Sequence, residues 1–408
     1  MIVKKVIKCG KFFSAVDDKV LENIAIVIDG NKIESVGPIS GCDCDGCEVI
    51  DLSGKFVMPG LIDAHLHTLM NGEVTCMDDM GKKTIGDMTI DSMKNAQSDL
   101  MAGFTTVRDE GSYGFADIAV RDAINAGKIT GPRMFVSGIP IGTTGGHCDS
   151  HYNPYITGQH SMGQVIDSPD AGRKAARYTL KYGADQIKVM ATGGVMSIGD
   201  KPGAPEFTYE EMKAILDVPN SRGKISTAHA HGAEGIKIAI RAGITSIEHG
   251  MLMDEECMDM MVEHGTYLVP TIIAAERIVA MGVENGLPAE AVGKAQRCLE
   301  NHGKNLEKCR AKGVKICFGT DAGTYYNRHG EQTREFGLMT EYGKFPVAEC
   351  LIAATRTNAE LMKWGDKVGT IEAGKLADVV AFDESPFDNI EIMNHCSFVM
   401  KDGVVYKG

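Results

Sequence analysis

Apolar and polar positions alternate over short segments in the first part of the chain. Such alternation, bounded by Gly, Asp and Asn, is typical of strands. The predicted strands are Ile2–Ile7, Asn23–Asp29, Lys32–Val36 and Glu48–Asp51. The sequence Asp29-Gly30-Asn31 between two of them favours a hairpin turn, because these residues accept a positive φ at low cost. This pattern therefore predicts that residues 1–57 form a β segment.

From residue 58 the pattern changes to strands that alternate with amphipathic helices. The predicted strands are Thr105–Arg108, Met134–Ser137, Gln186–Met190, Lys224–Ala228, Ser246–Glu248, Tyr267–Pro270 and Lys315–Gly319. One helix begins with a capping-box pattern, Thr208 and Glu211, and another ends at Gly243. Strand and helix in repetition imply a parallel sheet.

Short strands return near the C-terminus, at Asp378–Asp383, Ser397–Lys401 and Val404–Lys407. Each β-rich end alone is too small to bury a core. We therefore expect an α/β protein in which residues 58–364 form a (β/α)8 TIM barrel. Residues 1–57 and 365–408 are expected to pair into one small β-sandwich domain beside it.

Composition narrows the choice of partner. The chain has 408 residues, with 42 Lys and Arg against 55 Asp and Glu, a formal charge of −13. The chain has no basic cluster, so neither a nucleic acid nor an anionic membrane is expected as its partner. A small molecule is the expected partner. No apolar stretch is long enough to span a bilayer, and lysines interrupt the apolar N-terminus, so a cytoplasmic location is expected. A homo-oligomer is expected only by analogy with similar barrels.

The twelve cysteines give no disulfide framework in a chain of this size. Most are interpreted as small buried apolar residues. Cys42, Cys44 and Cys47 are clustered but lack a nearby fourth ligand, so a structural zinc site there has little support.

The strongest chemical signal is His65-Leu66-His67 after a predicted strand. Two His at i and i+2 on a strand point to the same side and can reach one ion. One such pair is weak support for a metal, but further polar residues follow the ends of other predicted strands: Lys188, His229, His231, His249 and Asp321.

The spacing of these residues fits a barrel. His65 to Lys188 spans three strand and helix units, Lys188 to His229 one more, and His249 to Asp321 two. They therefore follow strands one, four, five, six and eight, whose carboxyl ends form one rim of a barrel. Burying this many polar groups together without an ion would be costly, which favours a metal site.

Three motifs resemble one family. They are Ala102-Gly103-Phe104-Thr105-Thr106-Val107-Arg108-Asp109, Gly145-Gly146-His147-Cys148-Asp149, and Ile187-Lys188-Val189-Met190-Ala191-Thr192-Gly193-Gly194. With the His-x-His motif and the closing Gly374-Lys375-Leu376-Ala377-Asp378, the chain resembles the amidohydrolase superfamily over nearly its full length. The resemblance is to the branch with two metal ions bridged by a carboxylated lysine, and within it to prolidase-like and imidazolonepropionase-related zinc carboxypeptidases.

The resemblance implies a role for each ligand. His65, His67 and Asp321 would bind the more buried ion, and His229 and His249 the exposed one. Lys188, carboxylated by CO2 or bicarbonate to N6-carboxylysine, would bridge them, because a carbamate offers two oxygens where an ammonium offers none. The ligands suit two zinc ions, although manganese, cobalt or iron would also fit them.

The expected mechanism follows from these charges. Two metals would give a hydroxide near neutral pH, and the exposed ion would polarise the scissile carbonyl. Asp321 is the candidate base that takes the proton and returns one to the leaving amine, with pure ligation as the alternative. Asp63 is either an acceptor that orients an imidazole or a structural residue.

Substrate contacts are less determined. His231 lies on the same face as His229 and is a candidate to hydrogen-bond the substrate carbonyl or carboxylate; some members of the branch have Tyr there, which leaves specificity open. His147 and Tyr152 lie in a loop that would clamp an α-carboxylate, unless it is only a solvated loop. Arg108 would serve the same purpose or an internal ion pair, and Tyr325 would line the pocket.

We therefore expect a metal-dependent hydrolase that cleaves the amide bond of a dipeptide or an N-acyl amino acid and releases the C-terminal amino acid. A cyclic-amide hydrolase of imidazolonepropionase type is the first alternative. Deamination is disfavoured, because deaminases of this superfamily commonly use one metal without a carboxylated lysine. A non-catalytic scaffold is the remote alternative, since it would lack ligands and all six are present.

Overall fold

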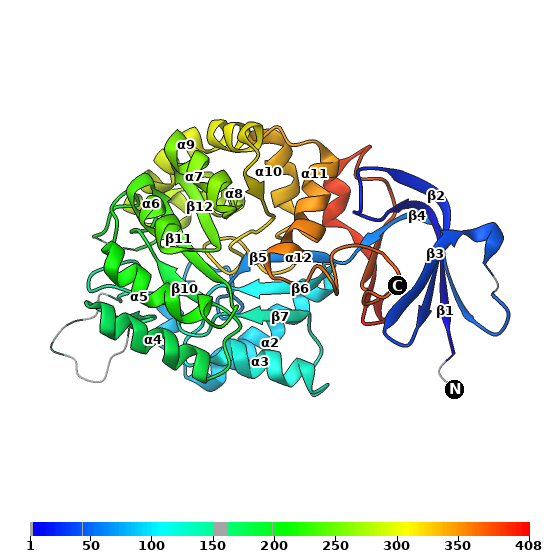
Figure 1. Ribbon diagram of the computed structural model, residues 1–408, viewed down its shortest axis with the longest axis horizontal. Coiled ribbons are helices and arrows are strands. Elements are labelled where there is room, and N and C mark those ends of the chain that lie inside the picture. Colours follow the sequence, from blue (N-terminus) through cyan, green and yellow to red (C-terminus); the bar gives the residue numbers. More distant parts are fainter. Residues whose placement is uncertain (1–2, 43, 151–152, 154, 156–160, 198) are drawn as a thin grey trace.

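The computed structural model describes residues 3–42, 44–150, 153, 155, 161–197 and 199–408. The molecule is elongated, with one β sheet near one end of its long axis and the alternating strands and helices at the other (Figure 1). Both chain ends lie in or beside that sheet.

The sheet at the chain ends has seven strands in the order β17-β16-β15-β4-β1-β2-β3. The strands are β1 (Lys5–Phe13), β2 (Val20–Asp29), β3 (Lys32–Pro38), β4 (Glu48–Pro59), β15 (Val379–Phe382), β16 (Cys396–Lys401) and β17 (Val404–Lys407). The expected hairpin turn joins β2 to β3, with Gly30 at φ 61°. Residue 2 of the expected first strand lies outside the described residues.

The two chain ends meet where β4 pairs with β15, in a register that places Val57 opposite Ala381. Alternate residues from several strands of this sheet share an apolar cluster that contains Ile7, Ile26, Val57 and Phe398. The pairing of both ends in one sheet is thus observed, whereas their separation as a sandwich domain stays a prediction.

The remaining strands are all parallel, as the alternation of strands and helices predicts. One sheet contains β5 (Leu61–Leu66), β6 (Phe104–Asp109) and β7 (Arg133–Val136). The other contains β8 (Ile141–Gly142), β9 (Gln164–Val165), β10 (Ile187–Met190), β11 (Ser226–Gly232), β12 (Ser246–Leu252), β13 (Tyr267–Val269) and β14 (Lys315–Ile316).

The larger of these two sheets contacts both edges of the three-stranded sheet. The Ala64 amide donates to the Phe318 carbonyl at 3.0 Å, just beyond β14, and the Asp185 amide donates to Val136 at 2.8 Å, between β7 and β10. The expected α/β fold with parallel strands is confirmed. The strands of the described residues do not form one closed ladder, so the closed barrel stays a prediction.

Helices follow the strands and cover the outside of the sheets (Figure 1). They are α1 (Cys76–Met80), α2 (Ile85–Met101), α3 (Ala116–Asn125), α4 (Pro169–Lys181), α5 (Tyr209–Asn220), α6 (Ala233–Ala242), α7 (Glu255–His264), α8 (Ile272–Met281), α9 (Ala289–Lys312), α10 (Arg334–Tyr342), α11 (Val347–Ile352) and α12 (Asn358–Leu361). Short helical turns lie at Ile39–Gly41, Val283–Asn285, Ala353–Thr357 and Ile390–Asn394.

Local sequence signals explain where several helices begin and end. The predicted capping box is present at α5, where the Thr208 hydroxyl and the Glu211 carboxylate each accept the other's backbone N–H. Helix α6 ends at Gly243, whose φ of 96° is left-handed. Both predictions are confirmed.

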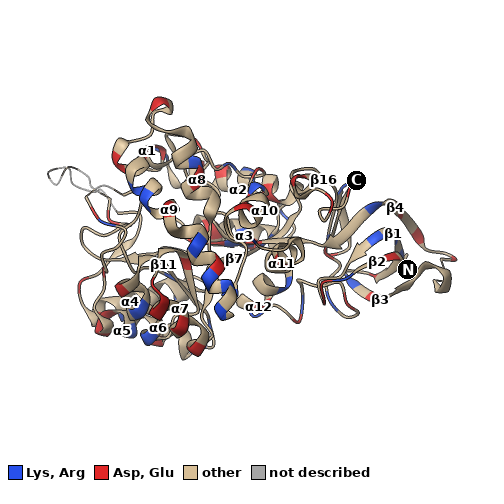
Figure 2. Ribbon diagram, turned by 90° about the horizontal axis from the view of Figure 1, so that it is seen from above, with Lys and Arg blue, Asp and Glu red and all other residues tan. Residues whose placement is uncertain are grey.

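Charged residues of both signs are interspersed along the outer helices α4 to α7 (Figure 2). A search of the described residues finds no helix that combines the length and the apolar character needed to cross a membrane.

Candidate metal centre

Residues that are far apart in the sequence converge at the carboxyl ends of the parallel strands. His65 lies in β5 and His67 just after it, Lys188 in β10, and His249 in β12. The six predicted metal ligands and both candidate substrate-binding histidines line one cavity: His65, His67, His147, Lys188, His229, His231, His249 and Asp321. The predicted convergence of these residues is therefore observed as a shared cavity.

His65, His67 and Asp321 form the tightest group. Oδ1 of Asp321 lies 3.3 Å from Nε2 of His65 and 3.2 Å from Nε2 of His67. One ligand atom from each residue lies within 4.8 Å of the others, a spacing that allows them to hold one metal ion. Burial opposes ionisation of Asp321, but the hydrogen bonds from the two imidazoles outweigh this effect and lower the pKa of Asp321 far below its usual value.

His229 and His249 complete the ring of imidazoles. Their ring centroids are 4.6 Å apart, and His249 lies 4.9 Å from His65. Burial, and then the neighbouring His and Lys188, lower the pKa of both His229 and His249 well below the usual value. Both rings are therefore held neutral, which is the form that ligates a metal.

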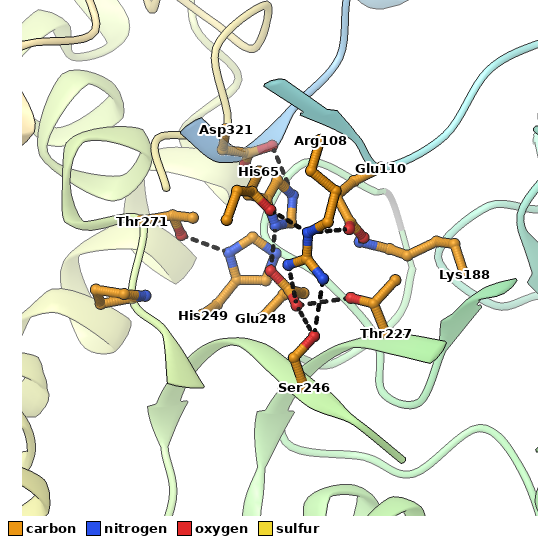
Figure 3. A network of polar contacts seen from close by, with 12 residues as sticks. His65, Arg108, Glu110, Lys188, Thr227, Ser246, Glu248, His249, Thr271 and Asp321 are labelled. Carbon is orange, nitrogen blue, oxygen red and sulfur yellow. Dashed lines mark hydrogen bonds and ion pairs between the residues drawn. The ribbon is translucent and has the colours of Figure 1, made fainter. Parts of the chain in front are cut away.

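Lys188 is buried. Its Nζ lies 3.1 Å from Oε2 of Glu110, a fully buried carboxylate (Figure 3). The other oxygen of Glu110 lies 2.9 Å from Arg108 Nε and 2.9 Å from Gln186 Nε2. Glu110 is thus held on two sides by cations, and it was absent from the residues predicted by sequence reasoning.

Glu248 is a second residue that sequence reasoning missed. Its Oε2 lies 2.7 Å from Nδ1 of His65, and its Oε1 accepts hydrogen bonds from Thr227 at 2.6 Å and Ser246 at 2.6 Å (Figure 3). Burial opposes ionisation, but Arg108 and His65 lower the pKa of Glu248 far below the usual value. The sequence signal that could have identified Glu248 is its position directly before His249 in a buried strand.

The role considered for Asp63 therefore belongs to Glu248. Asp63 is buried and accepts hydrogen bonds from the His65 amide at 3.0 Å and from the Thr320 hydroxyl at 2.6 Å. It ties β5 to the segment before Asp321 and contacts no imidazole nitrogen in the hydrogen bonds of the described residues. Its function is to hold the backbone on which the ligands sit.

The expectation that Arg108 binds substrate is wrong. Arg108 is completely buried, and its guanidinium lies 2.8 Å from Glu248 and 2.9 Å from Glu110. It also donates to the Ala64 carbonyl at 2.5 Å. The internal ion pair, which was the alternative, is observed because Glu110, just after β6, and Glu248, in β12, both contact the guanidinium.

His231 and His147 lie where they can meet a substrate. The His231 ring stacks on His249 with centroids 5.0 Å apart, and its Nδ1 is buried with no hydrogen-bond partner among the described residues. The His147 ring stacks on His229 at 4.1 Å, and its Nδ1 lies 2.8 Å from the Ser197 hydroxyl. Burial lowers the pKa of His231 to about 3 and that of His147 to about 4, so both are neutral near pH 7.

Of the two candidate tyrosines, Tyr325 does not line this cavity. Tyr325 is 7% exposed and belongs to an apolar cluster; the described residues that line the cavity include its neighbour Thr324 but not Tyr325. The tyrosine ring packs instead of facing the cavity, so that expectation is wrong. Tyr152 lies outside the described residues.

Three residues at the site have left-handed backbone conformations. They are His249 at φ 70°, Asp321 at φ 62° and Thr271 at φ 46°. Such conformations are unfavourable for residues other than Gly, above all for β-branched ones, and concentrate at functional sites. The Thr271 hydroxyl lies 2.7 Å from Nδ1 of His249, so the unusual backbone at Thr271 serves the orientation of that ring (Figure 3).

Comparison with known proteins agrees with this geometry. The sequence model of the Amidohydrolase family matches residues 56–408. The chain belongs to the amidohydrolase family. Ochratoxinase from Aspergillus niger is 31% identical over 419 residues, which cover 96% of this chain and 84% of that protein. An imidazolonepropionase from Brevibacillus brevis is 25% identical over 395 residues, which cover 88% of this chain and 82% of that protein.

A solved structure supports the same assignment. The crystal structure of a Xaa-Pro dipeptidase with bound methionine in its active site is 39% identical, with a TM-score of 0.92, and the match covers 99% of this chain and 100% of that one. This amidohydrolase is thus an enzyme of the hydrolase class that acts on amide or other C–N bonds. The family typically uses divalent metals, and the His, Glu and Asp groups described above can bind them.

Proposed function

We propose that this amidohydrolase hydrolyses the amide bond of a dipeptide or an N-acyl amino acid and releases the C-terminal amino acid. One observation carries the proposal: His65, His67 and Asp321 offer ligand atoms within 4.8 Å of one another, in a cavity that three further metal-ligand candidates also line. The similarity to a Xaa-Pro dipeptidase supports a peptide-like substrate.

The donor set fits a pair of divalent ions. Nδ1 of His65 is engaged by Glu248 and Nδ1 of His67 by the Gly111 carbonyl, at 3.4 Å, so that both Nε2 atoms face Asp321. Imidazole and carboxylate ligands with such outer hydrogen bonds are typical of zinc sites. His65, His67 and Asp321 would hold one zinc ion, and His229 and His249 the other.

Lys188 would bridge the two ions as its carbamate. Carboxylation by CO2 or bicarbonate replaces a positive charge with a negative one, and two divalent cations would stabilise it. The change removes the ammonium that pairs with Glu110. Glu110 would keep its contacts with Arg108 and Gln186 on its other oxygen after the modification.

Each residue of the site then has a separate role in the proposed hydrolysis. When bound, the ions would supply an activated water and polarise the amide carbonyl. Asp321 takes the proton of that water and delivers a proton to the leaving amine. His231 donates a hydrogen bond to the substrate carbonyl from its neutral ring. Glu248 holds His65 in one tautomer throughout.

The leaving amino acid needs a partner for its α-carboxylate. His147 is the candidate, since it lines the cavity beside His229 and is held by Ser197. Its backbone amide is bound by Glu206 at 2.6 Å, which fixes the loop that carries it. Tyr152 remains a further candidate from the same loop.

A closed barrel is the fold that we propose for the strands around this site. We infer that residues 58–364 form an eight-stranded (β/α)8 barrel, because backbone hydrogen bonds connect the two parallel sheets on both sides. Residues 1–57 and 365–408 would form the accessory β-sandwich domain. The strand order of the ligands, on strands one, four, five, six and eight, is that of the predicted rim.

A panel of substrates tests the proposal. The zinc-loaded enzyme should hydrolyse dipeptides or N-acyl amino acids, with the free C-terminal amino acid detected as product. A second candidate, cyclic-amide hydrolysis, is favoured by the similarity to imidazolonepropionase. Hydantoins and lactams therefore belong in the same panel, and turnover confined to rings would contradict the linear-amide proposal.

A further inference from the structure

The cavity has two parts that differ in chemistry. Its floor is the polar centre described above. One side is an apolar surface, called here the methionine wall, which belongs to a separate cluster of apolar side chains. The wall consists of Met70, Met77, Met80, Met251, Ala275 and Ile278.

The wall is assembled from several elements that surround the metal centre. Met77 and Met80 lie on α1, Ala275 and Ile278 on α8, and Met251 on β12, two residues after His249. Because it adjoins the predicted ligands, a substrate whose amide lies at the metals can place one of its ends against this wall.

The wall offers a ligand no charged partner. Among the described residues that line the cavity, the Lys, Arg, Asp and Glu side chains are Glu110, Lys188 and Asp321, all on the floor. Each is already engaged, Glu110 with Lys188 and Asp321 with the histidines. A charged group against the wall would lose its hydration without compensation, whereas an apolar group would gain from burial.

Methionine dominates the wall, and this choice has a physical consequence. Its unbranched, polarizable side chain adapts to ligands of different shape. A wall of Met77, Met80 and Met251 therefore selects for apolar character more than for one outline. The backbone segments beneath are well packed, since Met251, Ala275 and Ile278 are nearly fully buried.

We propose that the methionine wall binds the acyl side of the substrate, and that this side carries a large uncharged apolar group. The inference rests on the proposed amide hydrolysis. The leaving amino acid carries a carboxylate, for which the wall has no donor, so the acyl side is the part that fits it. Substrates whose acyl part has a small or charged side chain would be poor.

A pair of matched acyl groups tests this. With the leaving amino acid held constant, the N-(4-methylpentanoyl) substrate should be hydrolysed with a kcat/KM about 10- to 100-fold above that of the N-glutaryl substrate, the range expected from burying one aliphatic side chain. Equal values would overturn the inference. So would a preference that follows the side chain of the leaving residue instead of the acyl group.

Substitutions in the methionine wall provide a second test of the proposal. Gln is close to Met in size, so Met77→Gln/Met80→Gln changes polarity with little change in volume. This variant should reduce the ratio between the two substrates about tenfold, through KM, whereas Met77→Leu/Met80→Leu should retain the ratio. Both positions are only partly buried, which favours normal folding. An unchanged ratio in the Gln variant would overturn the assignment of the wall.

Binding of the free acids separates this inference from the proposed function. Calorimetry with 4-methylpentanoate and glutarate on the zinc-loaded enzyme needs no turnover. Preference for 4-methylpentanoate supports the wall even if no amide is cleaved, in which case only the proposed function fails. Equal or reversed affinity overturns the wall, whatever the enzyme hydrolyses.

Discussion

Nδ1 of His65 lies 2.7 Å from Oε2 of Glu248, and both side chains are buried. The carboxylate is itself compensated by Arg108, whose Nη2 lies 2.8 Å from the other oxygen. Such a carboxylate fixes the tautomer and direction of a ligating imidazole. The His65 ligand is therefore oriented by an ion pair that joins β6 to β12, and the following predictions test this and related contacts.

Replacing Glu248 should weaken the metal site. Glu248→Gln removes the charge beside His65 while keeping the shape of the side chain, and we expect metal affinity or activity to fall about 10- to 100-fold. The measurement is the metal content after dialysis against a chelator series, together with kcat/KM. The control is Glu234→Gln, at an exposed position of α6. Full metal retention in Glu248→Gln, with a native circular dichroism spectrum, would contradict the role.

Thr271 should orient His249 through its hydroxyl. Thr271→Val keeps a β-branched side chain at the same backbone conformation but removes the hydrogen bond of 2.7 Å to Nδ1. We expect a loss of about tenfold in metal affinity. Thr271→Ser, which keeps the hydroxyl, should retain most of it. If Val and Ser behave alike in a metal titration, the hydroxyl has no such function.

Lys188 should be required as a carbamate and not as an ammonium. Lys188→Ala removes the proposed bridge, and activity should fall by several orders of magnitude. Short carboxylic acids such as acetate or propionate should restore part of it, because they supply the two missing oxygens. Assays with and without these acids make the comparison. Unaltered activity in the variant would refute the bridge, and so would recovery with primary amines instead of acids.

Stability should depend on pH through Glu206. Burial raises the pKa of this carboxyl from 4.5 to about 8. Between these values the folded protein keeps the proton that the unfolded chain has lost. This stabilisation is full below pH 4.5 and is lost as the pH rises through 8. The free energy of unfolding should therefore decrease by up to about 1.4 kcal/mol per pH unit.

Glu206→Gln should remove this dependence, since Gln cannot ionise. The difference between the wild type and the variant in chemical denaturation, followed from pH 4.5 to 8, isolates the contribution. Glu210→Gln at an exposed position of α5 is the control. Parallel pH curves for the wild type and Glu206→Gln would show that the carboxyl does not titrate in this range.

Much of the site was predictable because it depends on local rules. Alternation along a strand places His65 and His67 on the same side, and parallel strands bring their carboxyl ends to one rim. Regular spacing between strands then located Lys188, His229, His249 and Asp321, all of which line the same cavity.

The ion pairs beneath the ligands were not predictable in this way. Arg108 and Glu248 are 140 residues apart, and their contact depends on how β6 and β12, which lie in different sheets, face each other and on side-chain length. Arg108 at a strand end resembled a substrate contact, but its burial shows a structural role. Only the folded arrangement distinguishes a cation that faces the cavity from one that lies below it.

The central claim is a two-metal centre held by His65, His67, His229, His249, Asp321 and carboxylated Lys188. The most direct measurement is the metal content of the purified enzyme by inductively coupled plasma mass spectrometry. We predict close to two divalent ions per chain, mainly zinc, and about one or fewer in Asp321→Ala. An enzyme that hydrolyses amides at full rate with no bound metal would contradict the account.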